Sequence, residues 1–179
     1  VILIEKNDFL GKKLRITGKG RCNITNIADT EDIIENIPTN GKFLYSALYS
    51  FTNYDIIALL EDLGVKTKVE RGGRVFPESD SARDVAEALK KYALGKNVQL
   101  VKQRAVGIMA DGGKVTGVKT DAGVIAADSV IIATGGKSYP LTGSAGDGYR
   151  FAERLGHTVV TPKPSLVPLV TKEKWVREV

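Results

Sequence analysis

The 179-residue sequence is 42% apolar and 26% charged, which is the composition of an ordinary globular domain that is long enough to bury a core. Its leading apolar run, residues 1–4, is far too short to span a bilayer and follows no signal-peptide pattern, so we expect a cytoplasmic protein without a membrane partner. The single cysteine, Cys22, excludes an internal disulfide and favours a reducing compartment.

The net charge of +5 is confined to one short segment. Residues 12–21 contain five cations and no acid, and without them the 26 basic residues fall to 21, equal to the 21 acidic ones. A nucleic-acid-binding protein usually spreads its cations along a face and interleaves them with aromatic side chains. A compact anion such as a pyrophosphate therefore fits this segment better. The five cations are Lys12, Lys13, Arg15, Lys19 and Arg21.

The first predicted element is a buried parallel strand over residues 1–5, V-I-L-I-E, which ends at Glu5. In a dinucleotide-binding unit, a Gly-rich G-x-G-x-x-G turn precedes such an acidic strand end by roughly twenty residues. The sequence has no room for that turn before Glu5. We therefore expect the chain to be part of a longer protein and to bind a dinucleotide weakly or not at all by itself, because the turn presents a helix N-terminus to the pyrophosphate.

A Gly-rich run, I-T-G-K-G-R-C-N-I-T-N, occupies residues 16–26. Glycines let backbone amides approach a ligand closely, the cations attract an anion, and short amides and hydroxyls fix a polar ring. The combination indicates a ligand-binding loop, and a loop with only a structural role is the alternative. We expect Cys22 to be a packed small residue rather than a redox nucleophile, because no second cysteine could resolve an oxidised thiol.

Three helices and a hairpin are predicted next. Apolar residues recur at helical spacing in two segments, and a third helix follows a capping-box pattern made by Ser81 and Asp84 and is closed by Gly95. An alternating pattern around a Gly-Gly turn indicates the hairpin. These elements are helices over 43–51, 56–63 and from Ser81 through Tyr92, and a hairpin with strands 65–69 and 74–76 that turns at 71–73.

From residue 98 the apolar period changes to two, which predicts one strand followed by a three-stranded meander. Residues 128–136, D-S-V-I-I-A-T-G-G, then predict a buried strand that ends in a Gly turn, where open α/β sheets bind ligands. The strand and the meander cover residues 98–101, 106–109, 115–119 and 123–126.

A last helix is predicted through Phe151 and Leu155. For Asp147, just before it, helix N-capping and a role at the ligand are equally favoured. The only histidine, His157, follows the Gly156 that ends the helix, so we expect a surface or capping residue rather than an acid or base. No Ser/His/Asp set and no metal-ligand cluster is visible in the sequence, so the catalytic residues stay unknown.

Several segments together resemble the HI0933-like, YhiN or BaiN-type family of flavoproteins, the NAD(P)/FAD-dependent oxidoreductases. That family typically carries T-G-G-G-R-C-N-x-T-N, and Lys19 stands at the position of its middle glycine. The resemblance covers essentially the whole chain. Besides residues 16–26, it rests on A-T-G-G-K-S-Y-P at 133–140, T-G-S-A-G-D-G-Y at 142–149, G-H-T at 156–158 and P-S-L-V-P-L at 164–169.

The resemblance implies an α/β fold, namely part of a glutathione-reductase-like FAD-binding domain with a parallel sheet, a three-stranded meander and a small helical insertion. The FAD-binding domain would cover residues 1–150, with the insertion at about 27–95, and residues 151–179 would begin a second, substrate-side domain. The implied activity is hydride transfer between FAD and a small organic substrate, with NAD(P)H as a candidate reductant. A flavin supplies its own redox chemistry, so the protein has mainly to bind and orient it.

The resemblance also implies a set of cofactor-binding residues. A carboxylate at the strand end would accept hydrogen bonds from the adenosine ribose, and the backbone at the start of the meander would hold the adenine edge. Two rival interpretations stay open: a cofactor-free structural fragment, and a nucleic-acid-binding domain that uses residues 12–21. The implied residues are Glu5, Lys13, Gly18, Gly20, Arg21, Asn23, Thr25, Val106, Thr134, Gly135 and Gly136.

Overall fold

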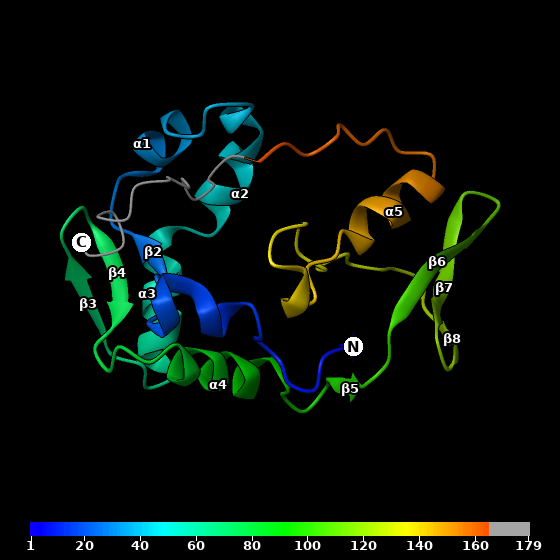
Figure 1. Cartoon of the computed structure of the whole chain (residues 1–179), viewed down its shortest axis with the longest axis horizontal. Helices are drawn as coiled ribbons and strands as arrows, with labels where there is room; N and C mark the ends of the chain where they lie inside the picture. The colour runs from blue at the N-terminus through cyan, green and yellow to red at the C-terminus, as the bar shows by residue number, and fades with distance from the viewer. Residues whose placement is uncertain (165–179) are drawn as a thin grey trace, which may run out of the picture.

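The computed structural model describes residues 1–164, which form three small sheets and five α-helices (Figure 1). The strand β1 (Ile2–Ile4) pairs in parallel with β5 (Gln99–Val101), so that Ile4 lies opposite Val101. The Glu5 amide extends this ladder by donating to the Val101 carbonyl at 3.0 Å. The predicted α/β class and the parallel pairing of this strand are confirmed, but the predicted burial is wrong, because Val1 is 87% and Ile2 44% exposed. The long connection between the two strands holds the helical insertion.

The insertion contains an antiparallel sheet in the order β2-β4-β3. The predicted hairpin is confirmed as β3 (Thr67–Glu70) and β4 (Arg74–Pro77), with the turn at residues 71–73. The strand β2 (Thr25–Asn26) was not expected. It is only two residues long and forms because the end of the Gly-rich run lies against β4, where Thr25 pairs with Val75.

The insertion has four helices: α1 (Thr30–Glu35), α2 (Tyr45–Ser50), α3 (Asn53–Asp62) and α4 (Ala82–Ala93). The last two contact strands of the sheet, and the first two contact each other. The predicted helices over 43–51, 56–63 and 81–92 correspond to α2, α3 and α4, whereas α1 was not expected. The predicted capping box at Ser81 is wrong, because its side chain makes no cap hydrogen bond and its backbone carbonyl accepts from Asp84 instead, at 3.2 Å. A capping box does form at α3, between Thr52 and Asp55.

The core of the insertion is a cluster of five buried residues that joins α3 and α4 to the Gly-rich run. Leu60 and Cys22 are both fully buried, and Val85 is almost so. Burial raises the pKa of the Cys22 thiol, against an opposing hydrogen bond with Thr17. The expectation that Cys22 is a packed residue is confirmed. The cluster consists of Cys22, Leu60, Val65, Ala82 and Val85.

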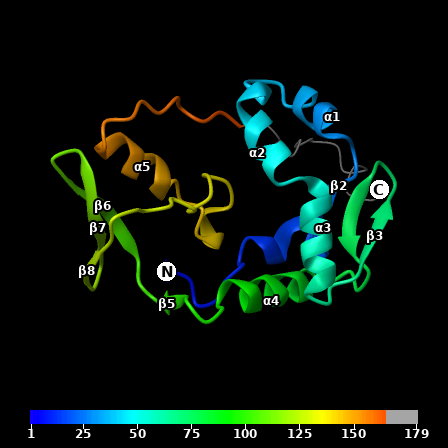
Figure 2. The ribbon, with the colours of Figure 1, turned by 180° about the vertical axis from the view of Figure 1, so that it is seen from behind.

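The predicted meander is confirmed as β6 (Ala105–Asp111), β7 (Lys114–Thr120) and β8 (Gly123–Ala126). It lies apart from the insertion, with α5 (Asp147–Arg154) beside β6 in both views (Figures 1 and 2). Among residues 1–164, no helix is long and apolar enough to cross a membrane.

The predicted buried strand over residues 128–134 is wrong. This segment pairs with no strand among the described residues, and Ile131 is 91% exposed. An apolar, β-branched run becomes a strand only where a neighbouring strand offers hydrogen bonds, and the described ladder of β1 involves β5 alone. At its end Gly135 has a left-handed backbone, with φ 71°, but residues 134–136 form no turn, and the chain bends only at residues 137–139. Of the predicted second domain, residues 165–179, with most of the P-S-L-V-P-L segment, lie outside the described residues.

The backbone at Lys19 has a left-handed conformation, with φ 58° and ψ 39°. In this conformation a residue with a Cβ is strained by roughly 1–2 kcal/mol. Glycine avoids most of this strain, but it loses more conformational entropy on folding. Lys19→Gly should therefore raise the free energy of unfolding by about 0.5 kcal/mol. Urea denaturation would test this, with Lys114→Gly in β7 as a control expected to lower stability. A loss of stability in both variants would contradict the interpretation.

Candidate functional site

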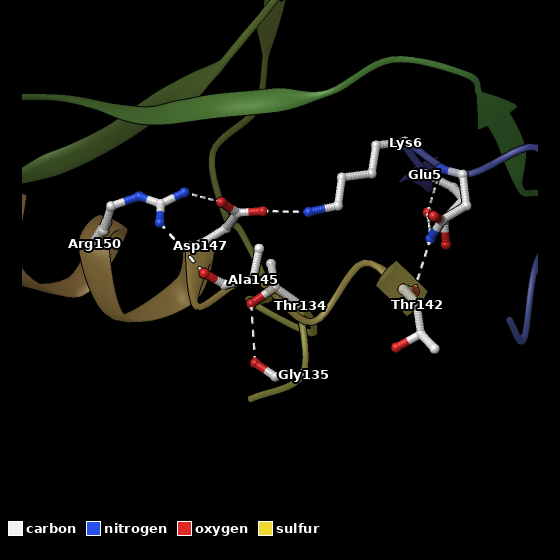
Figure 3. A network of polar contacts seen from close by, with 9 residues as sticks. Glu5, Lys6, Thr134, Gly135, Thr142, Ala145, Asp147 and Arg150 are labelled. Atoms are coloured by element: carbon white, nitrogen blue, oxygen red, sulfur yellow. Dashed lines mark hydrogen bonds and ion pairs between the residues drawn. The ribbon is translucent and has the colours of Figure 1, made fainter. Parts of the chain in front are cut away.

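Glu5 lies just past the end of β1, and Asn7 orients its carboxylate. Glu5 Oε1 accepts two hydrogen bonds from Asn7, from the backbone amide at 2.8 Å and from Nδ2 at 2.9 Å. Asn7 Nδ2 also donates to the Thr142 carbonyl at 3.2 Å, which ties the strand end to a distant loop (Figure 3). Glu5 Oε2 accepts no hydrogen bond from residues 1–164, so a half-buried, fixed carboxylate keeps one oxygen for a ligand.

A second polar group lies next to Glu5. Lys6 and Arg150 each form an ion pair with the Asp147 carboxylate, one with each oxygen (Figure 3). The expected N-cap role of Asp147 is wrong: Gly146, with φ 80°, is the N-cap, and Asp147 is the first residue of α5. Partial burial by itself raises the pKa of Asp147. The hydrogen bond from Lys6 and the nearby positive charges outweigh this, so the pKa lies below its ordinary value.

The Asp147 carboxylate should make stability depend on pH. Because its folded-state pKa is depressed, its contribution is present above the unfolded pKa of about 3.9 and is lost as the pH falls through the folded value. Asp147→Asn should thus lower stability by about 1 kcal/mol near neutral pH, but much less at about pH 3. Urea denaturation at both pH values measures the difference, with Asp128→Asn as the control. An equal loss at both pH values would contradict this assignment.

Residues 134–136 pack closely on the start of α5 and on Ser144 just before it. A Cβ at Gly148 would lie 2.5 Å from Thr134 Oγ1, and one at Gly135, where φ is 71°, would lie 3.1 Å from Ser144 Oγ. The Gly146 amide donates to the Gly136 carbonyl at 3.2 Å. The glycines therefore allow residues 134–136 to meet the start of α5, where Asp147 pairs with Lys6, and Figure 3 shows Thr134 beside Ala145 and Asp147.

Lys13 joins the basic segment to the same region. Its Nζ donates to the backbone oxygen of Ser138 at 2.9 Å and to its hydroxyl at 2.8 Å, and lies 5.3 Å from the centre of the Tyr139 ring. The first part of the basic segment thus lies beside the loop that follows Gly136.

Arg21 lies in a different environment. Its guanidinium forms ion pairs with Glu70 and Asp80 and stacks 4.2 Å from the centre of the Phe76 ring. Hydrogen bonds, first to Glu70 and then to Asp80, raise the pKa of Arg21. In this structure the Arg21 charge is balanced within the insertion, and it fastens the Gly-rich run to the hairpin.

The other predicted residues of the Gly-rich run lie near Arg21. A Cβ at Gly18 would lie 2.9 Å from the Asn23 amide, so this turn is tightly closed, while Gly20 faces open space. Thr25 lies in β2 and lines a small pocket of about 210 Å³ with residues of α1, α2 and α3. Within residues 1–164, no hydrogen bond or ion pair links this group to Glu5 or to residues 134–136.

Val106 lies at an irregularity in β6. The pairing register shifts between Ala105 and Gly107, so Val106 has no opposite partner on β7, and its carbonyl accepts from Arg154 at 3.1 Å.

His157 is exposed, and its amide donates to the Ala152 carbonyl at 3.0 Å where α5 ends. The expectation that His157 is a surface or capping residue is confirmed.

The structure adds three residues that the sequence prediction did not include: Lys6, Asn7 and Thr142. Lys6 and Asn7 follow the acidic strand end directly, and this adjacency is the signal that could have identified them. Thr142 takes part through its backbone oxygen, so its side chain gives no signal. Together with Glu5, Lys13 and residues 134–136, they form the candidate site.

Comparison with known proteins matches residues 1–165 to a family model described as "HI0933-like protein Rossmann domain". The chain is 33% identical over 173 residues to a 3-dehydro-bile acid delta(4,6)-reductase of Clostridium scindens, which is 97% of this chain and 42% of that protein. It is 29% identical over 181 residues to a ribosomal RNA dihydrouridine synthase of Escherichia coli, 99% of this chain and 44% of that protein.

A D-amino-acid oxidase of Bradyrhizobium diazoefficiens is 33% identical over 99 residues, which is 54% of this chain and 24% of that protein. The chain thus spans less than half the length of each of these relatives. By their names, two of the three catalyse oxidation or reduction of small organic molecules, and one modifies RNA.

Proposed function

The chain belongs to the HI0933-like Rossmann-domain family, and from this premise we propose that it is the FAD-binding part of a flavin-dependent oxidoreductase. The observation that carries the proposal is the Glu5 carboxylate, fixed by Asn7 at the end of a parallel strand with one oxygen free. A carboxylate in this position suits the two hydroxyls of an adenosine ribose. The names of two relatives support oxidation or reduction as the class of reaction.

The residues around Glu5 fit a dinucleotide. Residues 134–136 pack against Ser144 and the start of α5, and Lys13 contacts Ser138 in the loop that follows, where it is our candidate cation for the pyrophosphate. Val106, without an opposite partner on β7, is our candidate for backbone contact with the adenine. FAD, when bound, supplies the hydride chemistry. We keep residues 1–150 as the FAD-binding domain of glutathione-reductase-like type, and residues from 151 onward as the start of a substrate-side domain.

The Gly-rich run has a modified role in this proposal. Because Glu70 and Asp80 balance the Arg21 charge, Lys13 is the stronger candidate for contact with the pyrophosphate. Gly18 and Gly20 offer backbone amides, and Asn23 and Thr25 offer polar side chains, on the insertion side of the ligand. Arg21 then acts mainly by holding this run against the hairpin.

A small organic substrate is our first choice, with NAD(P)H as the reductant in a cytoplasmic enzyme. RNA is the second candidate, because a relative that covers 99% of the chain is named a ribosomal RNA dihydrouridine synthase. Charge favours the small molecule, since Arg15 and Arg21 form ion pairs within the chain, and among the described residues only three of the five cations of the basic segment stay without one. Retention on heparin at moderate salt would favour RNA.

The proposal is tested with the two halves of the cofactor. ADP contains the ribose that Glu5 would bind, whereas FMN does not. We expect ADP to shift the amide NMR signals of Glu5, Asn7 and residues 134–136 of the chain at concentrations where FMN leaves them unchanged. Equal shifts with both nucleotides, or ADP shifts confined to the exposed basic residues, would contradict an adenosine site at Glu5.

A further inference from the structure

A groove of about 540 Å³ lies between two loops that are far apart in the sequence. One loop is residues 9–16 and the other is residues 139–142. Its volume is within the range of small-molecule sites in proteins. The exposed apolar side chains here are large, with Leu141 at 90% and Tyr139 at 68% exposure. The groove walls are mainly apolar and include Phe9, Ile16, Tyr139 and Leu141, and the two charged residues that line it are Lys12 and Arg15.

The charge of the groove is positive. Lys12 forms no ion pair with the described residues, and Arg15 forms one, with Glu87 at 2.5 Å. The Arg15 guanidinium also stacks 4.8 Å from the centre of the Phe9 ring, so Lys12 carries the unbalanced charge of the groove. This cation favours a ligand that carries a negative charge.

The groove adjoins the candidate cofactor site. Thr142 lines the groove, and its carbonyl accepts from the Asn7 side chain that fixes Glu5. Lys13 lies over the Tyr139 ring and contacts Ser138, so the same loop borders both places. A molecule in the groove would lie beside a dinucleotide at Glu5.

We propose that this groove binds an organic anion with a flat apolar body and a single acidic group, such as an aromatic or alicyclic carboxylate. The apolar walls fit the body, and Lys12 fits the carboxylate. A polyphosphate would leave these walls uncovered and is disfavoured. That this anion is the substrate of the enzyme rests on the proposed function. That the groove binds the anion does not rest on it.

Binding is tested by titrating the 179-residue chain, without FAD, with 2-naphthoate and with its neutral analogue 2-naphthylmethanol. We expect 2-naphthoate to bind about tenfold more tightly, as for one charge-assisted contact. Lys12→Gln should remove most of this difference. Leu141→Ser should weaken both ligands by about fivefold, and because Leu141 is 90% exposed the change should not disturb folding.

Two matched controls lie elsewhere on the chain. Lys114→Gln removes an exposed cation at the start of β7, and Phe43→Ser removes a side chain that is 86% exposed. Neither should change the binding of 2-naphthoate. Absence of binding, equal binding of the acid and the alcohol, or the same losses in the control variants would overturn the proposal.

A final titration with FAD at millimolar concentration separates the groove from the cofactor site. If 2-naphthoate still binds when FAD is bound, the groove is a separate site, as we propose. If FAD displaces it competitively, the groove belongs to the cofactor and our inference fails while the proposed function stands. If 2-naphthoate binds as expected and FAD binds without shifting the signals of Glu5 or residues 134–136, the proposed function fails and the anion groove stands.

Discussion

Replacing Leu60 with alanine is expected to lower the free energy of unfolding by about 3 kcal/mol. Leu60 is fully buried in the cluster that joins α3, α4 and the Gly-rich run, so the truncation removes apolar contacts and leaves a cavity that the neighbouring elements cannot fill completely. The loss is a large share of the stability of a domain of this size.

The Leu60 variant should also loosen the Gly-rich run, because Cys22 packs in the same cluster. Urea denaturation measures the first effect, and hydrogen exchange at residues 18–23 measures the second. Leu141→Ala, at a position that is 90% exposed, is the control and should change stability by less than about 0.5 kcal/mol. If the Leu60 and Leu141 variants had the same stability, the core would lie elsewhere.

Patterns that repeat over a few residues predicted most of the insertion and the meander. The helical period identified α2 and α3, and the alternating pattern around Gly72 and Gly73 identified the β3–β4 hairpin. These elements are determined by neighbours in the sequence, so a single sequence is sufficient. The short helix α1 was missed because six residues carry too little periodicity.

Features that depend on distant residues were not predicted. The acidic partners of Arg21 lie 49 and 59 residues away in the sequence. The Gly-rich run by itself therefore could not predict that Arg21 binds to the hairpin. Lys6 pairs with Asp147, 141 residues away, and this pairing replaces the expected N-cap. The segment at 128–134 has a strand-like composition, but a strand also requires an adjacent partner, which local sequence does not reveal.

The second large effect is expected at Glu5. Glu5→Gln keeps an oxygen that can accept from Asn7, so the local structure should survive, but it removes the charge that strengthens the hydrogen bonds with the ribose. The loss in affinity for FAD should be about ten- to a hundredfold. Glu78→Gln, at an exposed acid in the insertion, is the matched control and should leave the affinity unchanged.

An NMR titration of the unmodified chain, Glu5→Gln and Glu78→Gln with FAD tests the account most directly, since it measures even the weak binding expected of this chain. We expect FAD to shift the signals of residues 134–136 in the unmodified chain and in Glu78→Gln with the same dissociation constant. Glu5→Gln should need at least about tenfold more FAD for the same shifts. Equal dissociation constants for all three proteins would contradict a dinucleotide site built around Glu5.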